Sequence, residues 1–156
     1  MNRKARSKQS DHPNGRPAEG QVSIKKVTKE GIAKVLTFLP FVRDINQSAG
    51  QVLGSERHGE IVSMPYASLS ERATEFVDAC YQANLVQSFD WTAWAEKNAA
   101  LAHEGKGLES ADLDCIIRLV TAHLRADRFV EGHLLEVLKS GLMRRILERL
   151  QEISSA

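Results

Sequence analysis

The side chains best suited to acid–base or ion-binding chemistry are concentrated in one short segment. This segment carries two histidines, two arginines and two acidic residues: His123, Arg125, Asp127, Arg128, Glu131 and His133. Arginine offers forked donors to a carboxylate or phosphate, and histidine titrates near neutral pH. One interpretation is therefore a small anion or carboxylate site. There Arg125 and Arg128 would bind the ligand and Glu131 would orient one of them, while His133 would donate or shuttle a proton.

A structural interpretation explains the same residues. Arginine–carboxylate pairs often fix the angle between two helices. Gly132, which follows Glu131, allows two backbones to approach closely. We prefer this internal ion-pair network, and we keep five residues as the candidate polar site: Arg125, Asp127, Arg128, Glu131 and His133.

Other chemistries find less support in the spacing. His123 and Asp127 are spaced i, i+4, but no two histidines lie four apart as zinc proteases require. Cys80 and Cys115 are lone thiols on apolar faces, as in proteins of a reducing cytoplasm. No Gly-x-Ser-x-Gly motif is present. We therefore predict no metal, no cofactor and no catalytic residue.

A group of arginines lies on a predicted helix that follows the dipeptide Ser140-Gly141: Arg144, Arg145 and Arg149. A short helix meets a longer one there, as in a helix-turn-helix whose second helix contacts DNA. However, Glu136 takes a position where such a unit buries an apolar side chain. An ordinary antiparallel helix pair explains the pattern, so nucleic-acid binding is an alternative that we do not favour.

Charge is unevenly distributed along the 156 residues, whose formal net charge is +1. Residues 1–29 have a balance of +6 and the remainder has a balance of −5. The near-neutral total excludes binding to nucleic acid or membranes through overall charge. We expect residues 1–22 to be a disordered basic tail. Its candidate nucleic-acid contacts are Arg3, Lys4, Arg6 and Lys8.

The first half of the ordered chain has two patterns. Apolar residues at helical spacing predict a first helix that Thr28 caps and Pro40 kinks or ends. The Gly- and Ser-rich stretch that follows predicts two short strands, at residues 52–53 and 61–62, joined by a polar turn. Because an isolated hairpin is marginally stable, we expect it to lie on the helices.

Helical signals dominate from Pro65 onward. A capping box at Ser68 and Glu71 predicts a second helix that runs to about residue 86. Asp90 caps a third, which ends before Gly105, and Ser110 caps a fourth. Apolar stripes predict a fifth helix over residues 134–138, with a left-handed C-cap position at Gly141, and a sixth over residues 142–153.

These elements predict one mainly α-helical domain over residues 23–156, with about six helices and a small β-hairpin insertion. Phe89, Trp91 and Trp94 are expected to lie in its core. No run of about 18–20 apolar residues suggests a membrane span, and we expect a cytoplasmic protein.

Two segments resemble a family of bacterial proteins that carry a domain of unknown function. They are residues 89–94, Phe-Asp-Trp-Thr-Ala-Trp, and residues 121–134, Thr-Ala-His-Leu-Arg-Ala-Asp-Arg-Phe-Val-Glu-Gly-His-Leu. The resemblance covers roughly residues 32–153 and implies a soluble single-domain protein. It supplies no catalytic residue or ligand. We therefore expect a small non-catalytic binding or interaction module, with an unidentified protein or small molecule as its partner.

Overall fold

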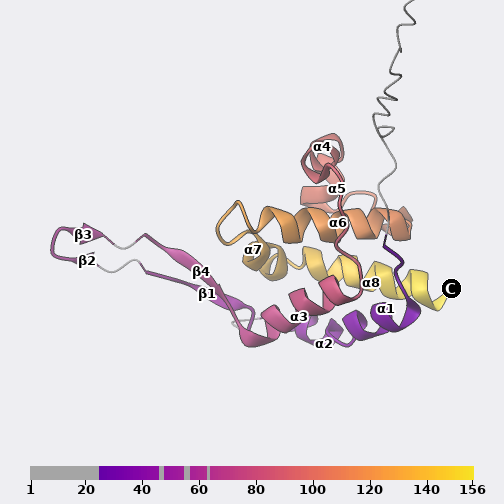
Figure 1. Cartoon of the computed structure of the whole chain (residues 1–156), viewed down its shortest axis with the longest axis horizontal. Coiled ribbons are helices and arrows are strands. Elements are labelled where there is room, and N and C mark those ends of the chain that lie inside the picture. The colour runs from indigo at the N-terminus through magenta and orange to yellow at the C-terminus, as the bar shows by residue number, and fades with distance from the viewer. Residues whose placement is uncertain (1–24, 46–47, 55–56, 63) are drawn as a thin grey trace, which may run out of the picture.

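The computed structural model describes residues 25–45, 48–54, 57–62 and 64–156. It consists of a helical body from which a β arm, residues 50–69, extends to one side (Figure 1). The helices are α1 Lys29–Leu36, α2 Leu39–Arg43, α3 Glu71–Gln82, α4 Trp91–Lys97, α5 Ala99–Glu104, α6 Leu113–Ala126, α7 His133–Lys139 and α8 Leu142–Ser155, with a 3-10 turn η1 at Leu108–Ser110. The strands are β1 Gly50–Leu53, β2 Arg57–His58, β3 Ile61–Val62 and β4 Tyr66–Leu69. The predicted fold, mainly helical with a small hairpin, is confirmed.

Helices α6 and α8 form the centre of the body. Apolar residues of α8 recur every three or four positions, so one face of the helix is buried along its whole length. This face packs against α1, α2, α6 and α7. The fully buried side chains in the centre include Ile116, Leu119, Met143, Ile146 and Leu150. One apolar core therefore joins helices from both ends of the sequence.

The first predicted helix is two helices. Thr28 caps α1 as expected, its hydroxyl accepting a hydrogen bond from Gly31 N. However, α1 ends at Leu36, and Pro40 lies in the first turn of α2. Proline is tolerated in a first turn, where its missing N–H has no helical partner. Pro40 therefore helps to start α2 and does not end α1.

Two predicted starts were misplaced by two residues. The side chain that caps α3 is Ser70, which accepts from Ala73 N, because Ser68 belongs to β4 and pairs with Gln51. Asp112, not Ser110, caps α6 and accepts from Cys115 N. In each case the chain offers two capping residues close together, and tertiary context selects the second.

The middle helices also end at residues other than those predicted. Helix α3 ends at Gln82, and Asn84 takes a left-handed conformation with φ 58° that turns the chain before residue 86. Asp90 caps α4 as predicted. Asn98 then breaks the third predicted helix into α4 and α5, its side-chain amide donating to Trp94 O.

The aromatic group at α4 lies outside the core, contrary to expectation. Helix α4 has no buried residue. Trp94 packs on the edge of the core and meets Phe89 edge to face, with ring centroids 6.3 Å apart. Trp91 instead stacks on Phe129, a ring that is 77% exposed.

The β arm departs most from the sequence prediction. Residues 52–53 pair with Tyr66 and Ala67 of β4, whereas β3 pairs with β2 farther out. The hairpin is therefore longer than predicted. It extends away from the helices, and among its described residues Ala67 and Leu69, at its base, pack against the core (Figure 1).

None of the helices in the described residues has both the length and the apolar character that a bilayer crossing requires. The same residues include no group of three or more His, Cys, Asp and Glu side chains that could bind a metal ion.

Candidate functional site

The two histidines of the predicted cluster contact each other between α6 and α7. His123 Nδ1 lies 3.0 Å from His133 Nε2, and the rings stack with centroids 5.3 Å apart. His123 is 3% exposed, and its Nε2 makes no well-formed hydrogen bond within the described part of the chain. Burial, with the neighbouring His133, lowers the pKa of His123 to about 4, although the backbone of Ala102 opposes this shift. His123 is therefore neutral at neutral pH.

The pKa of His133 is also lowered, mainly by burial. The nearby carboxylates of Asp127 and Glu136 oppose this shift and favour the protonated ring. One imidazole can donate to the other while both are neutral. The pair thus acts as a polar contact that joins α6 to α7.

The two acidic residues of the cluster bind backbone N–H groups. Asp127 Oδ1 accepts from Leu134 N at 2.8 Å, in the first turn of α7, whose N-cap residue Gly132 has no side chain. Glu131 Oε1 accepts from Ala67 N at 2.5 Å, and this bond links the α6–α7 loop to β4. Both carboxylates therefore anchor secondary structure.

The arginines of the cluster are placed differently. Arg125 is half-buried and Arg128 is exposed, and neither forms an ion pair with any described residue. The bracing contacts found here are hydrogen bonds to backbone, where we had expected arginine–carboxylate pairs. An anion site at Arg125 and Arg128 remains a prediction.

The candidate nucleic-acid contacts on α8 divide into two kinds. Arg145 donates to the carbonyls of Glu104 and Gly105, and Arg149 donates to the carbonyl of Ala111. These two arginines tie α8 to the chain between α5 and α6. Arg144 is exposed near the start of α8. The tail candidates Arg3, Lys4, Arg6 and Lys8 lie outside the described residues.

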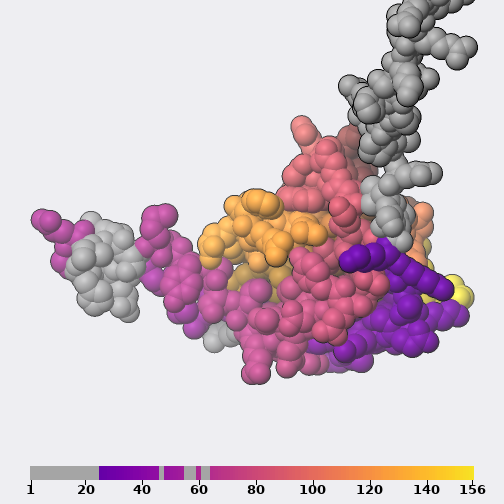
Figure 2. All heavy atoms as spheres, in the orientation of Figure 1, coloured from indigo at the N-terminus to yellow at the C-terminus, as the bar shows by residue number. Residues whose placement is uncertain are grey.

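A surface that the sequence did not single out lies where the arm meets the α6–α7 loop. Six large apolar side chains are conspicuously exposed among the described residues, and five of them are on the arm or this loop. We call these five residues together the arm surface, in which Val52 and Tyr66 lie on opposite faces of the ribbon because they belong to neighbouring pairs: Val52 (64% exposed), Met64 (83%), Tyr66 (53%), Phe129 (77%) and Val130 (56%). The sixth, Tyr81, is on α3. Figure 2 shows the loop and the base of the arm as adjoining surfaces.

One weak sequence signal for this surface existed. Phe129 and Val130 lie between the apolar stripes of two helices, where a loop is expected and large apolar residues are uncommon. Their exposure could not be deduced, because it depends on how the arm leaves the body.

The two edges of the arm differ at its base. Ser70 N donates to Ala49 O, so Ala49 and Ser70 form a hydrogen-bonded pair. Along an antiparallel ribbon, hydrogen-bonded pairs alternate with pairs whose backbone groups point away from the partner strand. The backbone groups of Gly50 and Val52 on β1, and of Ala67 on β4, therefore point outward. The outward N–H of Ala67 donates a hydrogen bond to the carboxylate of Glu131. No backbone hydrogen bond from the described chain reaches the outward groups of Gly50 and Val52.

Comparison with known families finds one match. The profile of DUF6508, a family of unknown function, matches residues 27–156. The chain belongs to this family. Comparison with curated proteins and with solved structures finds no match. The matched segment of this DUF6508 protein contains the helical body, the arm and all the candidate site residues except the four in the tail.

Two cavities of the DUF6508 protein adjoin the base of the arm. The strand-edge cavity, of about 660 Å³, lies over the base of the ribbon and is lined by residues of both strands and by Lys139: Gly50, Gln51, Val52, Ser68, Leu69, Ser70 and Lys139. The basic cavity, of about 470 Å³, lies between α2, α7 and α8, and its charged lining residues are Arg43, Asp44, Lys139 and Arg144. Lys139 lines both cavities.

Proposed function

We propose that this DUF6508 protein is a non-catalytic interaction module that binds another protein at the arm surface. The observation that carries the proposal is the concentration of exposed apolar side chains on the arm and the α6–α7 loop. Scattered apolar residues are normal on a protein surface, whereas a concentration of large ones typically marks a site of interaction.

The base of the arm is held in place before any partner binds. Glu131 fixes Ala67 through a hydrogen bond, and Ala67 and Leu69 pack against the core. Phe129 in turn stacks on Trp91 with ring centroids 6.1 Å apart. A partner would therefore meet side chains that are already positioned, which reduces the entropy lost on binding.

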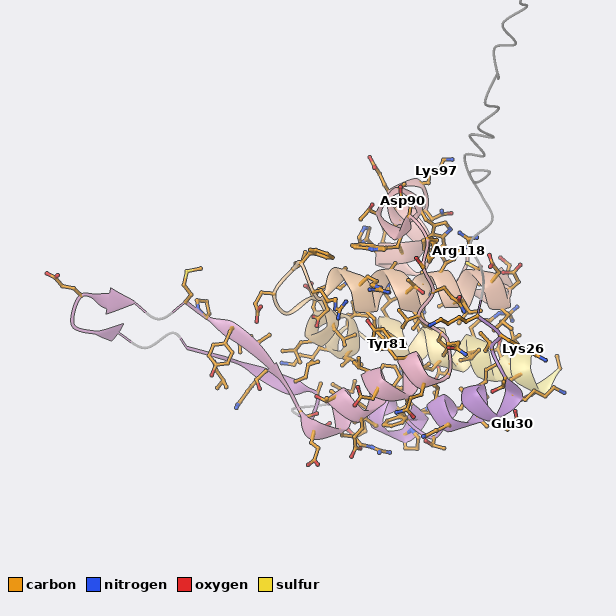
Figure 3. The ribbon with its side chains drawn as sticks, in the orientation of Figure 1. Lys26, Glu30, Tyr81, Asp90, Lys97 and Arg118 are labelled. Carbon is orange, nitrogen blue, oxygen red and sulfur yellow. The ribbon has the colours of Figure 1, made fainter. Side chains whose placement is uncertain are left out.

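Site-specific photo-crosslinking in the cells that produce the protein tests this proposal. A photoreactive phenylalanine analogue replaces Tyr66 in one variant and Val130 in another. The matched control replaces Tyr81, which is exposed on α3 away from the arm (Figure 3). We expect a discrete protein adduct from both arm-surface positions and none from Tyr81. Intact mass then shows whether the partner is a second copy or another protein.

The purified complex provides a second measurement. Phe129→Ser removes an exposed ring and should weaken binding of the captured partner about tenfold, since aromatic residues commonly dominate interfaces. Tyr81→Ser should leave the affinity unchanged. Absence of an adduct at both arm positions, or the same adduct at Tyr81, would contradict the proposal.

A further inference from the structure

We infer that the partner segment is an extended, acidic peptide that pairs with the outer edge of β1 and places a carboxylate in the basic cavity. This inference rests on the proposed function and specifies the chemistry of its partner. Three features of the described residues support it: a free strand edge on β1, the strand-edge cavity beside it, and an excess of positive charge in the basic cavity.

The free strand edge indicates an extended backbone as the occupant. Proteins usually cover or block exposed edges, because unpaired N–H and C=O groups attract another strand. On β4 the side chain of Glu131 blocks the edge at Ala67. On β1 the outward groups of Gly50 and Val52 remain available to a peptide that adds a strand.

The cavities give such a peptide a path. A strand paired with β1 would run beside the strand-edge cavity, which residues 50–52 of β1 and Lys139 of α7 both line. Continuing past Lys139, it would enter the basic cavity, where Val42 and Leu138 line the wall. A side chain of the peptide would then reach the space between α2 and α8.

The charges of the basic cavity determine what that side chain is. Three cationic residues from three helices line it, Arg43, Lys139 and Arg144, against a single acidic residue. Arg43 is bound in part by Glu148, with Nε and Oε1 3.1 Å apart. Lys139 and Arg144 have no ion pair with any described residue.

The start of α8 adds to the same positive field. Gly141 provides no side-chain cap there, and the guanidinium group of Arg144 folds back toward it. The positive end of the helix dipole and the arginine thus lie together. An acidic side chain with a planar carboxylate, Asp or Glu, matches this arrangement in both charge and geometry.

Selection from a random-peptide display library, with the full chain as bait, tests the inference. We expect the enriched peptides to combine β-branched or aromatic residues with at least one Asp or Glu. A synthetic copy of an enriched peptide should bind about tenfold more weakly to the double variant Lys139→Glu/Arg144→Glu. Raising the salt concentration should weaken its binding to the parent chain.

Two further variants separate the features. Val52→Pro removes the outward N–H of β1 and should also weaken binding, because proline is tolerated at a strand edge but cannot pair. Lys97→Glu is the matched control, a charge reversal on α4 far from the arm, and should have no effect (Figure 3). Circular dichroism should show unchanged helix content in every variant.

The outcomes distinguish this inference from the proposed function. Enriched peptides without acidic residues, bound equally by the parent and the double variant, would overturn the inference and leave the interaction module intact. Tighter binding of a DNA duplex than of any enriched peptide, lost in the double variant, would assign the basic cavity to nucleic acid. If no peptide is enriched and no photo-crosslinked adduct forms, both proposals are wrong.

Discussion

Within the helical body, His123 is a buried titratable ring and contacts the half-buried ring of His133. The pKa of His123 is about 4, below the ordinary value of 6.5, because burial and the facing His133 disfavour the charged ring. Below about pH 6.5 the unfolded chain takes up a proton that the folded chain excludes. Stability should therefore fall as the pH drops from about 6.5 to about 4.

For His123 alone the loss should approach about 3 kcal/mol, and His133 shifts in the same direction. Urea unfolding at a series of pH values between about 7 and about 4 measures it. In the variant His123→Leu, which removes the buried titrating group, the slope of unfolding free energy against pH should be shallower. An unchanged slope would show that other groups cause the acid sensitivity.

Asp127 belongs to the predicted site, yet its observed contact is a helix cap. Because its Oδ1 accepts from Leu134 N, Asp127→Ala should lower the free energy of unfolding by about 1 kcal/mol. Asp127→Asn retains an acceptor oxygen and should lose only a few tenths of a kcal/mol. Chemical denaturation at neutral pH compares the three proteins. If asparagine destabilises as much as alanine, the carboxylate charge is what stabilises α7.

At the scale of elements, a side chain 64 residues away in the sequence helps to anchor the arm to the body. Glu131→Ala removes the acceptor for Ala67 N, so amide exchange at the base of β4 should accelerate about tenfold. Glu131→Gln keeps an acceptor and serves as the control. Hydrogen-exchange mass spectrometry of peptides covering residues 66–69 reports the change, and equal protection in the alanine variant would contradict it.

Helical periodicity predicted most elements because the body buries apolar stripes. The apolar stripes of α6 and α8 predicted where these two helices begin and end to within a few residues, since each helix has one face in the core. Gly141 has φ 83°, a left-handed conformation that favours glycine, as expected between α7 and α8. Local capping was less decisive. Ser68 has the stronger local signal, because Glu71 completes a capping box with it, yet the pairing of β4 with β1 places Ser68 in a strand and leaves Ser70 as the cap.

The candidate site was harder to predict, for a physical reason. Residue types alone predicted that Asp127, Glu131 and His133 belong to an anion site or to an arginine–carboxylate network, and none of the three forms an ion pair with a described arginine. Their partners, however, are Leu134 N, Ala67 N and His123, and two of these are backbone groups that carry no sequence signal. The arm surface depends on exposure, which periodicity does not determine once a hairpin leaves the body.

At the scale of the whole molecule, the core and the arm are nearly independent. No arm residue whose burial the structure describes belongs to the buried core, which α1–α3 and α6–α8 dominate. Two-stranded ribbons contribute little stability alone. The arm should therefore contribute little to the stability of the body, which agrees with its proposed role in binding a partner.

This separation predicts the outcome of shortening the arm. Leu53 and Tyr66 face each other as a pair, so replacing residues 54–65 by Asn-Gly closes the ribbon with a two-residue turn. Since none of the residues in this segment whose burial is described belongs to the core, the melting temperature should change by less than about 3 °C in calorimetry. Unfolding should remain a single cooperative transition.

The same variant separates the outer arm from its base as a binding element. It keeps the Gly50–Val52 edge, Phe129 and Val130, but it loses Met64, the most exposed apolar side chain of the arm surface. A partner that pairs with β1 should therefore bind this variant with similar affinity, whereas binding of a partner that contacts the outer arm should be lost. A large fall in melting temperature would instead show that the outer arm stabilises the body, because removing a segment independent of the core leaves the core contacts unchanged.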